Sequence, residues 1–408
     1  MHLTEYSNSL RNSELLLDLG LQPVSNRFIE SGSSDIVPHY PLKLMLNKET
    51  GLVHVAKPFP VEDLKPRFDW ITCFEPEDHL DELVENIINL PNINTDSSFA
   101  GFSFKDRSTL ERLEGHGYSN QWVIDPKVDL GVLDTLSSIE THQAEFTISK
   151  ADSIKKHRGL SDVFILRHVL EHAENTAVFL EAAKKLIKSD GYLVLEVPDC
   201  EKGLTAGDPT IIWEEHTCYF TGFSFQYLLE LAGFDVLHYQ CIPYPFENSI
   251  VAIVRKNTTS EKIRNTQLDN LDLEIKRARS FRSKISRRRH SIRSTLERFQ
   301  TKNMPIALFG AGHLAVTFLS IMKIEHLIEF VIDDNPYKHG MRFPISNLEI
   351  FDSRSLYNKK VGLCLLGLNP QNQPQIIKKH NQFIENGGIF ASIFPGSNID
   401  LALINDEY

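Results

Sequence analysis

The residues whose types and spacing best suit chemistry form one segment, which reads Trp213-Glu214-Glu215-His216-Thr217-Cys218-Tyr219-Phe220. It follows a strand-like run that ends Leu195-Glu196-Val197-Pro198. The segment therefore lies just beyond the carboxyl end of an expected central strand, where open α/β sheets bind their ligands. Because histidine exchanges protons near neutral pH, the segment predicts proton abstraction from a carbon acid by His216. The alternative is an acidic surface turn with a solvent-facing histidine.

A second group of candidate residues ends an earlier strand-like run, residues 162–168. His168 and His172 would reach the same sheet edge, and one of them could approach a substrate beside His216. The other interpretation is a histidine held by its neighbour Glu171. The order H-x-x-E-H resembles a metalloprotease motif, but that motif lies within a helix and this one ends a strand. We therefore expect no metal site here.

Composition limits the possible classes of protein. A chain of 408 residues is long enough for two or three domains. Its net charge of −11 argues against nucleic-acid binding by the whole chain. The five cysteines form no C-x-x-C pair, which fits a reducing compartment. We see neither a signal peptide nor an apolar run that could span a membrane, so we expect a cytoplasmic protein.

The expected fold is α/β, in three parts joined by a helical linker. Residues 1–75 are short apolar runs broken by Pro and Gly, and they predict a small β-rich module. Residues 76–257 begin with a helix around Leu80–Ile88 and then alternate strands and helices. They predict a doubly wound, class I methyltransferase-like Rossmann sheet closed by a late hairpin.

Residues 258–303 are polar, with apolar residues repeating every three or four positions, and they predict a long amphipathic helix or a helical pair. The run Arg287-Arg288-Arg289-His290 could be a nucleic-acid patch, but we favour a solvated helix face. The helix could be an intramolecular spacer or a dimer contact, so a monomer and a homodimer both stay open.

Residues 304–408 predict a small Rossmann-like domain, in which a strand leads into a turn at Gly310 and Gly312. Such a turn lets backbone N–H groups approach a phosphate, and Asp333 or Asp334 could then hold a ribose. Since the pattern lacks a third glycine, a tight turn without a ligand is equally open.

The loop expected to hold a cofactor in the middle domain lies within residues 99–110. Only Gly101 keeps the small size that close backbone approach requires, and the bulky residues Phe102, Phe104 and Arg107 follow it. Asp125, at the end of the next expected strand, is placed to accept hydrogen bonds from ribose hydroxyls.

Taken together, these motifs resemble the sugar C-methyltransferases, three-domain S-adenosylmethionine enzymes that methylate a carbon of nucleotide-linked keto-deoxysugars. Residues 19–28 are similar to the family's L-G-x-x-P-x-x-N-x-F signature, and residues 169–172 match its V-L-E-H element. Residues 215–220 look like its E-H-x-x-Y-F catalytic segment. In the C-terminal domain, residues 310–312 and 333–340 resemble G-A and D-x-N-P-x-K-x-G.

The chain departs from the family pattern at several points. Two of the four zinc-binding cysteines of the N-terminal module would fall on Asn47 and Thr50, so we expect that module to hold no zinc. The glycine loop, usually G-x-x-D-G, reads Ser103-Phe104-Lys105-Asp106-Arg107. A substrate-binding segment that is usually rich in tyrosine reads Phe68-Asp69-Trp70, and Trp213 and Glu214 stand where the family tends to have Tyr and His.

The resemblance implies a mechanism. A 4-keto group acidifies the neighbouring C–H of the sugar, and His216 removes that proton while Glu215 holds its ring in the useful tautomer. His172 or Tyr219 stabilises the enolate oxygen, and the enolate carbon attacks the methyl group of S-adenosylmethionine. Gly101, Asp106, Asp125 and His168 are the expected cofactor-binding residues. The expected substrate-binding residues are Phe68, Trp70, Trp213, Gly310, Gly312 and Asp333.

Two further hypotheses stay open. The loss of both glycines from the glycine loop favours a non-catalytic homologue that binds a sugar nucleotide without methylating it. A third interpretation keeps the histidine chemistry without a methyl donor, for example in an epimerisation. In all three, the expected partner is a nucleotide sugar rather than a nucleic acid or a membrane.

Overall fold

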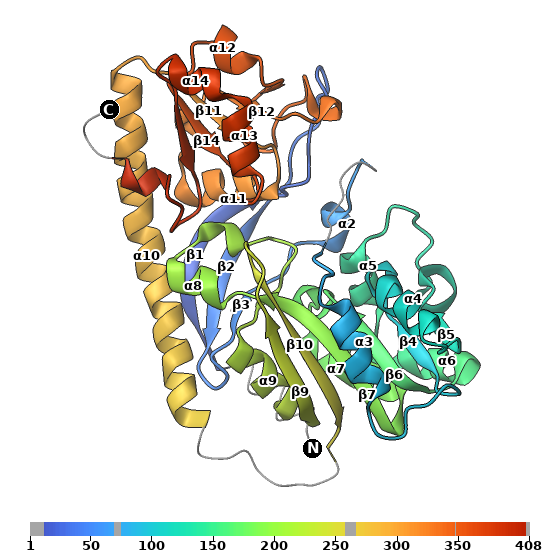
Figure 1. The fold of residues 1–408 in the computed structure, drawn as a ribbon. Coiled ribbons are helices and arrows are strands. Elements are labelled where there is room, and N and C mark those ends of the chain that lie inside the picture. The colour runs from blue at the N-terminus through green and yellow to red at the C-terminus, as the bar shows by residue number, and fades with distance from the viewer. Residues whose placement is uncertain (1–11, 69–74, 258–266, 347, 405–408) are drawn as a thin grey trace.

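The structure is a computed structural model that describes residues 12–68, 75–257, 267–346 and 348–404. It contains three sheets, one in each of the three parts of the chain, and a long helix that runs beside them (Figure 1). None of the described helices is both long and apolar enough to cross a membrane.

The N-terminal sheet is antiparallel, with the strand order β1-β2-β3-β8. Its strands are β1 (Ser13–Pro23), β2 (His39–Asn47), β3 (Val53–Val55) and β8 (Cys218–Tyr219). In β2 the buried residues Leu42, Leu44 and Leu46 alternate with more exposed neighbours, as a strand with one covered face requires. β8 comes from the expected catalytic segment, so residues far along the chain complete this sheet.

The middle sheet has the order β5-β4-β6-β7-β10-β9. The strands β5, β4, β6 and β7 are parallel, and β10 and β9 form an antiparallel hairpin beside β7. Its strands are β4 (Phe99–Gly101), β5 (Gln121–Val123), β6 (Ser161–Arg167), β7 (Ile187–Asp199), β9 (Phe234–Ile242) and β10 (Asn248–Lys256). This confirms the expected class I methyltransferase fold. The strand order reverses between β4 and β6, which is where such sheets bind ligands.

Both faces of the middle sheet are covered. Phe164 and Leu166 of β6 pack in one apolar core, whereas Val163 and Ile165 pack in the other. Two buried faces explain why this strand reads as a continuous apolar run. The covering helices are α3 (Leu80–Ile88), α4 (Arg107–Gly115), α5 (Ile139–Glu145), α6 (Ile148–Arg158), α7 (Thr176–Leu186) and α9 (Gly222–Leu231).

The C-terminal sheet is fully parallel, with the order β13-β12-β11-β14-β15, and confirms the expected Rossmann-like unit. Its strands are β11 (Ile306–Phe309), β12 (Phe330–Ile332), β13 (Ile350–Phe351), β14 (Leu363–Leu366) and β15 (Ile389–Ser392). The helices of this part are α11 (His313–Met322), α12 (Ser355–Asn358), α13 (Gln373–Lys379) and α14 (Asn381–Glu385). Two short helices, α2 (Val61–Leu64) and α8 (Glu201–Ala206), belong to the earlier parts.

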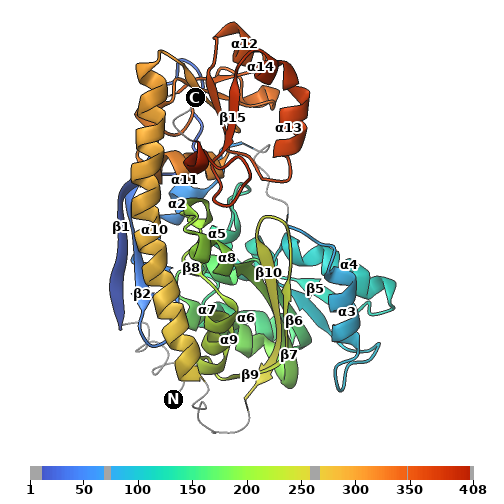
Figure 2. The same cartoon turned by 60° about the vertical axis from the view of Figure 1, so that its left-hand side comes forward.

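The linker is one continuous helix, α10 (Gln267–Thr301), which runs along one side of the molecule (Figures 1 and 2). Its apolar positions are buried as the spacing predicts: Ala278, Phe281, Ile285, Ile292, Leu296 and Phe299. The expectation of a solvated basic face is wrong for two of the arginines. Arg288 forms an ion pair with Asp400 at 2.6 Å, and Arg289 donates to the carbonyl of Ile321 at 2.9 Å. These contacts fix the helix to the C-terminal part.

Candidate active site

A cavity of about 530 Å³ lies where the three parts of the chain meet. Each part contributes to its wall, for example Asn26 and Phe28, Glu140 and His172, and Gly312 and Lys338. The middle sheet faces this cavity with the loops that follow its parallel strands. The cavity is therefore at the sheet edge where the sequence predicts chemistry.

The cavity wall contains a carboxylate–histidine pair. Glu140 is the second residue of α5, and His172 ends the short helix η3 (Leu170–His172) that follows β6. Glu140 Oε1 lies 3.1 Å from His172 Nδ1, and both side chains are at least nine-tenths buried. The backbone carbonyl of Glu215 lies 3.1 Å from the same ring nitrogen. Glu140 is not predicted from the sequence, because it belongs to no recognisable motif.

Glu215 faces the same cavity, but it does not hold His216 as expected. Its Oε1 accepts a hydrogen bond from Asn26 Nδ2 at 3.1 Å, and its carboxyl group is hydrogen-bonded to Glu140. Burial, and then the charge of Glu140, raise the pKa of Glu215 well above its ordinary value. Although burial opposes it, the contact with His172 lowers the pKa of Glu140 to about 2. The surroundings therefore favour the ionised form of Glu140 and the protonated form of Glu215.

His216 lies beside His172 and is partly exposed, whereas His172, Glu140 and Glu215 are buried. The ring of His216 is 4.7 Å from the ring of His172, at an interplanar angle of 89°, and 5.0 Å from the ring of Trp213. Burial, and then the neighbouring His172, hold the pKa of His216 well below its ordinary value. The structure thus brings His172, Glu215 and His216 together, but in a different arrangement from the one expected.

The backbone around His216 is clamped from two sides. Thr217 N donates to Glu171 O at 2.7 Å, and Val55 N of the N-terminal sheet donates to Thr217 O at 2.9 Å. The Thr217 hydroxyl donates to Ala173 O at 2.7 Å. Tyr219, expected to face the enolate, is instead fully buried in β8, and its hydroxyl donates to Trp213 O at 3.1 Å. Tyr219 does not line the cavity, because β8 pairs with β3 and its side chain packs in the core below the N-terminal sheet.

Trp213 does line the cavity, as expected of a substrate-binding residue. Its indole stacks on the imidazole of His313 at 4.5 Å and 21°. His313 begins α11, so the stack joins the catalytic segment to the C-terminal part. Burial lowers the pKa of His313 to about 4, which keeps the ring neutral.

The expected cofactor loop is closed by its own carboxylate. Asp106 Oδ2 accepts from the amides of Phe102 and Ser103 at 2.8 and 2.7 Å, and its Oδ1 accepts from Arg167 N at 2.8 Å. Asp106 is fully buried, so it supports the loop and does not face a cofactor. Gly101 has the same role, because a Cβ there would lie 2.9 Å from that of Asp106. Both expectations of direct cofactor contact are therefore corrected.

His168 is also a supporting residue and not a cofactor ligand. It is buried with a left-handed backbone (φ 50°), and its Nε2 lies 3.2 Å from Glu196 Oε1. Glu196 also pairs with Arg167 at 2.5 Å and with His79 at 3.0 Å. Although burial opposes it, the charges of Glu75 and Glu196 raise the pKa of His168 to about 10. This buried ion network underlies the loop that carries His172.

Asp125 keeps the position expected of a ribose ligand. It follows β5 and is exposed. Its Oδ1 accepts from the amides of Lys127 and Val128, at 2.9 and 2.8 Å. These bonds fix the carboxylate at the sheet edge and leave Oδ2 for hydroxyl donors. A carboxylate acceptor at this residue thus fits the ribose hydroxyls of a nucleoside cofactor.

The C-terminal glycine turn reaches the cavity through Gly312, whereas Gly310 lies behind it. Gly310 has φ +104°, and a Cβ there would meet the backbone of Gly367 at 3.1 Å. Asp333 accepts from Ala311 N at 2.8 Å and lies 3.1 Å from Lys338 Nζ. Asp333 therefore holds the turn itself, and Lys338 is the charged residue that this part presents to the cavity.

The remaining predicted residues lie elsewhere. Phe68 packs against the core shared by the N-terminal and C-terminal parts and is not part of the cavity wall. Trp70 lies outside the described residues. Where the resemblance would place a pair of cysteines, Asn47 Oδ1 accepts from the amides of Glu49 and Thr50 at 2.9 Å each. The side-chain amide of Asn47 thus stabilises this turn.

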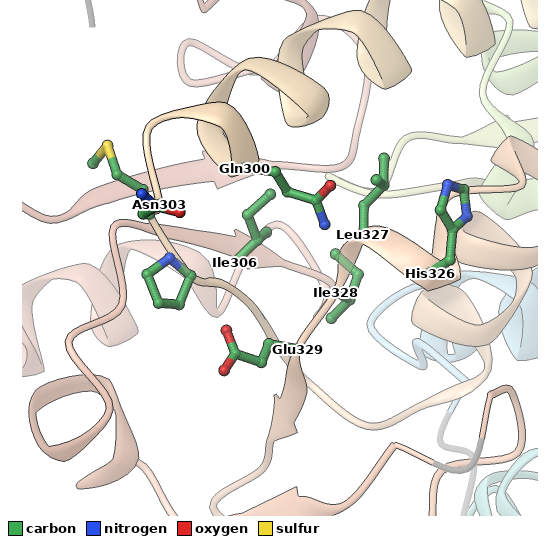
Figure 3. A pocket seen from close by; sticks show the side chains of 9 residues that line it. Gln300, Asn303, Ile306, His326, Leu327, Ile328 and Glu329 are labelled. Carbon is green, nitrogen blue, oxygen red and sulfur yellow. The ribbon is translucent and has the colours of Figure 1, made fainter.

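A second hollow, of about 540 Å³, lies at the opposite end of the C-terminal sheet (Figure 3). Gln300 of α10, Ile306 of β11 and Glu329 before β12 lie around it. It is at the amino ends of the strands, whereas ligands bind at the carboxyl ends in such sheets. The cavity around His172 is therefore the better candidate for the active site.

Comparisons with known proteins identify the class of enzyme. Residues 105–239 match a family model described as a methyltransferase domain, and residues 250–395 match one described as a C-methyltransferase C-terminal domain. The chain therefore contains a methyltransferase domain, and its C-terminal part is similar to the C-terminal domain of C-methyltransferases. No curated protein matches the chain.

Several solved structures share part of the fold at low similarity. The 1,6-didemethyltoxoflavin-N1-methyltransferase of Burkholderia thailandensis, determined with S-adenosylhomocysteine, is 12% identical over 44% of this chain and 77% of its own, with a TM-score of 0.29. S-adenosylmethionine-dependent methyltransferases from Anabaena variabilis and Clostridium acetobutylicum are 11% and 8% identical. They cover 44% and 45% of this chain and 86% and 93% of their own, each with a TM-score of 0.29. TM-scores this low are no guide to substrate or mechanism.

Proposed function

We propose that the protein transfers a methyl group from S-adenosylmethionine to a carbon beside the keto group of a nucleotide-linked deoxysugar. The observation that carries this proposal is the position of the Glu140–His172 pair. It lies in one cavity with Lys338 and the glycine turn of a Rossmann-like domain. A proton-accepting site and a wall suited to an anionic nucleotide thus face each other.

The nucleotide would lie against the C-terminal wall. Gly312 is the N-cap of α11, and backbone amides at a helix start attract phosphate oxygens. Lys338 adds positive charge beside this turn, and Trp213 offers an aromatic face for the sugar or base. The keto-sugar would then extend toward His172.

The methyl donor would lie over the middle sheet, with Asp125 holding its ribose hydroxyls. When bound, S-adenosylmethionine supplies an electrophilic methyl group. The protein's own contribution is to bind the sugar, to remove a proton from the carbon beside its carbonyl, and to stabilise the resulting oxyanion. Lys105 lines the cavity from the loop after β4, and its ammonium group is suited to that stabilisation.

One observation favours the alternative of a non-methylating homologue. The loop after β4 is filled by the carboxylate of Asp106, and the exposed side chain of Phe104 projects beside the cavity. Both features reduce the backbone surface open to a cofactor. In that case the protein would bind the sugar nucleotide, and the histidine would act without a methyl donor.

The test is incubation with methyl-¹³C S-adenosylmethionine and a set of nucleoside-diphosphate 4-keto-deoxyhexoses. We expect one product that is heavier by one labelled methyl group, with the label bonded to a ring carbon next to the carbonyl. Binding of the sugar nucleotides without any labelled product would favour the non-methylating homologue. If the sugar nucleotides neither bind nor give a labelled product, both functions are rejected.

A further inference from the structure

We infer that Glu171, His172 and His216 bind a divalent transition-metal ion at the edge of the cavity, and that this ion blocks the proposed proton transfer. The binding site does not depend on the proposed function, whereas the block rests on it. One carboxylate and two imidazoles are donor types that bind Zn²⁺ and Co²⁺ in proteins. The site differs from the H-x-x-E-H motif of the sequence, because His216 takes the place of His168.

The three side chains converge from two segments of the chain. Glu171 and His172 belong to η3, and His216 lies in the turn before β8. One potential ligand atom of each lies within 4.8 Å of the other two. Glu171 Oε1 is 3.9 Å from His172 Nε2. Because Zn²⁺ lies about 2.0–2.2 Å from nitrogen and oxygen ligands, an ion fits between these two atoms with little movement.

The carboxylate of Glu171 lacks a hydrogen-bond donor. Glu171 is 1% exposed, and its Oε2 makes no hydrogen bond to any residue that the structure describes. Its Oε1 lies 3.5 Å from His168 Nδ1. Burial of a carboxylate oxygen without a donor is unfavourable, and a bound cation would supply the missing interaction.

Both histidines keep a ring nitrogen that can bind a cation. Nδ1 of His172 lies 3.1 Å from Glu140 Oε1 and 3.1 Å from the carbonyl oxygen of Glu215. Since both neighbours are acceptors, the neutral ring carries its hydrogen on Nδ1 and its lone pair on Nε2. The ring of His216 packs against the rings of His172 and Trp213. It makes no hydrogen bond within the part of the chain that the structure describes.

Glu140 provides the supporting carboxylate that metal-bound histidines usually have. Such a histidine donates its second ring N–H to a carboxylate or a carbonyl, which fixes the ring and strengthens the lone pair on the other nitrogen. Glu140 has this position at His172. Glu140, His172 and Glu215 also form a close cluster, but there the two carboxyl groups are bonded to each other. The ion therefore belongs on the Nε2 side of His172.

The proposed site is open to solution. His216 is partly exposed, and His172 lines the cavity. Three protein ligands also leave at least one coordination position for water, whereas a closed structural zinc site has four protein ligands. An ion can therefore enter and leave the folded protein, and a chelator can remove it.

The consequence for the proposed reaction is inhibition. The proposed methyl transfer needs an unprotonated histidine nitrogen that accepts the substrate proton. An ion held by His172 and His216 occupies the lone pairs that could accept it, and its charge disfavours an imidazolium beside it. Metal binding and proton transfer thus exclude each other, whichever of the two histidines accepts the proton.

The binding experiment is calorimetric titration of the full chain, first treated with EDTA and dialysed, with Zn²⁺ alone. We expect one ion per chain at micromolar or tighter affinity. Glu171→Gln, His172→Asn and His216→Asn should each weaken binding by roughly 10²-fold or more. Glu140→Gln should weaken it by roughly 10-fold, because this change removes only a supporting contact.

Glu145→Gln and His290→Asn are matched controls at exposed positions, and both should bind Zn²⁺ as the wild type does. Wild-type affinity in His216→Asn, or an equal loss of affinity in the two controls, overturns the site.

A measurement on the wild type does not depend on how the variants fold. In crystals grown with Zn²⁺, we expect an anomalous diffraction peak about 2.0–2.2 Å from His172 Nε2, from a Glu171 oxygen and from a ring nitrogen of His216. A peak between Glu140 and Glu215, or no peak at these residues, overturns the site.

Methyl transfer by the wild type to a nucleoside-diphosphate 4-keto-deoxyhexose tests the block. We expect activity in EDTA, half-inhibition at the Zn²⁺ concentration that half-fills the site, and recovery with excess EDTA. Activity that requires the metal, or that persists when the site is full, overturns the block. A wild type without methyl transfer in either condition rejects the proposed function and with it the block, while the titration still decides the cation site.

Discussion

The indole of Trp213 stacks on the imidazole of His313 with ring centroids 4.5 Å apart, although Trp213 belongs to the middle part of the chain and His313 to the C-terminal part. His313 begins α11 beside the glycine turn, and Trp213 lies three positions before His216. The stack therefore fixes the spacing between the wall proposed for the nucleotide and the histidines. A change at either ring should affect how the sugar is held more than how the proton is removed.

Trp213→Ala should raise KM for the sugar nucleotide by roughly 3- to 10-fold, because an aromatic pair contributes about 0.5–1.5 kcal/mol. Trp213→Phe keeps an aromatic face and should retain most of the affinity. Steady-state kinetics of the two variants provide the measurement. An unchanged KM in Trp213→Ala would show that this residue does not contact the substrate.

Asp106→Asn should destabilise the protein by about 1–3 kcal/mol, because the amide would present a donor to backbone N–H groups that now share a carboxylate. Urea unfolding at pH 7 measures this change. Asp81→Asn is the matched control, since the Asp81 side chain is largely exposed and its ion pair is a surface pair. If the two variants unfold alike, the loop does not depend on the Asp106 carboxylate.

The buried His168 gives the stability a specific dependence on pH. Its folded pKa, about 10, is raised above the ordinary 6.5 by the charges of Glu75 and Glu196, which outweigh burial. The folded state thus holds this proton more tightly than the unfolded state. The contribution is complete below about pH 6.5 and is lost as the pH rises toward 10. We therefore expect the free energy of unfolding to fall across this range.

His168→Gln should reduce stability at pH 7 and flatten that alkaline decline, because no proton is then held beside Glu196. Urea unfolding at pH 6.5 and pH 9 compares the slopes, with His290→Gln as a control at an exposed position. An equally steep decline in His168→Gln would assign the effect to other groups.

Much of the fold follows from local patterns in the sequence. The apolar run from Val163 to Leu166 predicts a buried strand, and the structure has it as part of β6, which pairs in parallel with β7. The site was harder to predict, because side-chain directions are set by tertiary contacts. Glu215 precedes His216 in the chain, yet it turns toward Asn26, since Thr217 is clamped between η3 and β3. Glu140 belongs to a short helix without a motif, so only the folded structure reveals its contact with His172.

The role of α10 as an internal support can be tested at its basic run. Arg288→Ala should destabilise the protein by about 3 kcal/mol, because it leaves the buried Asp400 carboxylate without its partner. Arg287 is the matched control, since it is exposed and adjacent. Calorimetric unfolding of Arg288→Ala and Arg287→Ala gives the comparison. Equal Tm values would contradict a structural role for the ion pair.

The central claim is that the chain still binds a methyl donor although Asp106 closes the loop after β4. Calorimetric titration with S-adenosylmethionine and with S-adenosylhomocysteine tests it most directly. We expect one site of micromolar affinity, weakened by roughly 10-fold in Asp125→Ala, which removes the expected acceptor of the ribose hydroxyls. No binding up to millimolar concentrations of either compound would contradict the methyltransferase account and leave the His172 site to a reaction without a methyl donor.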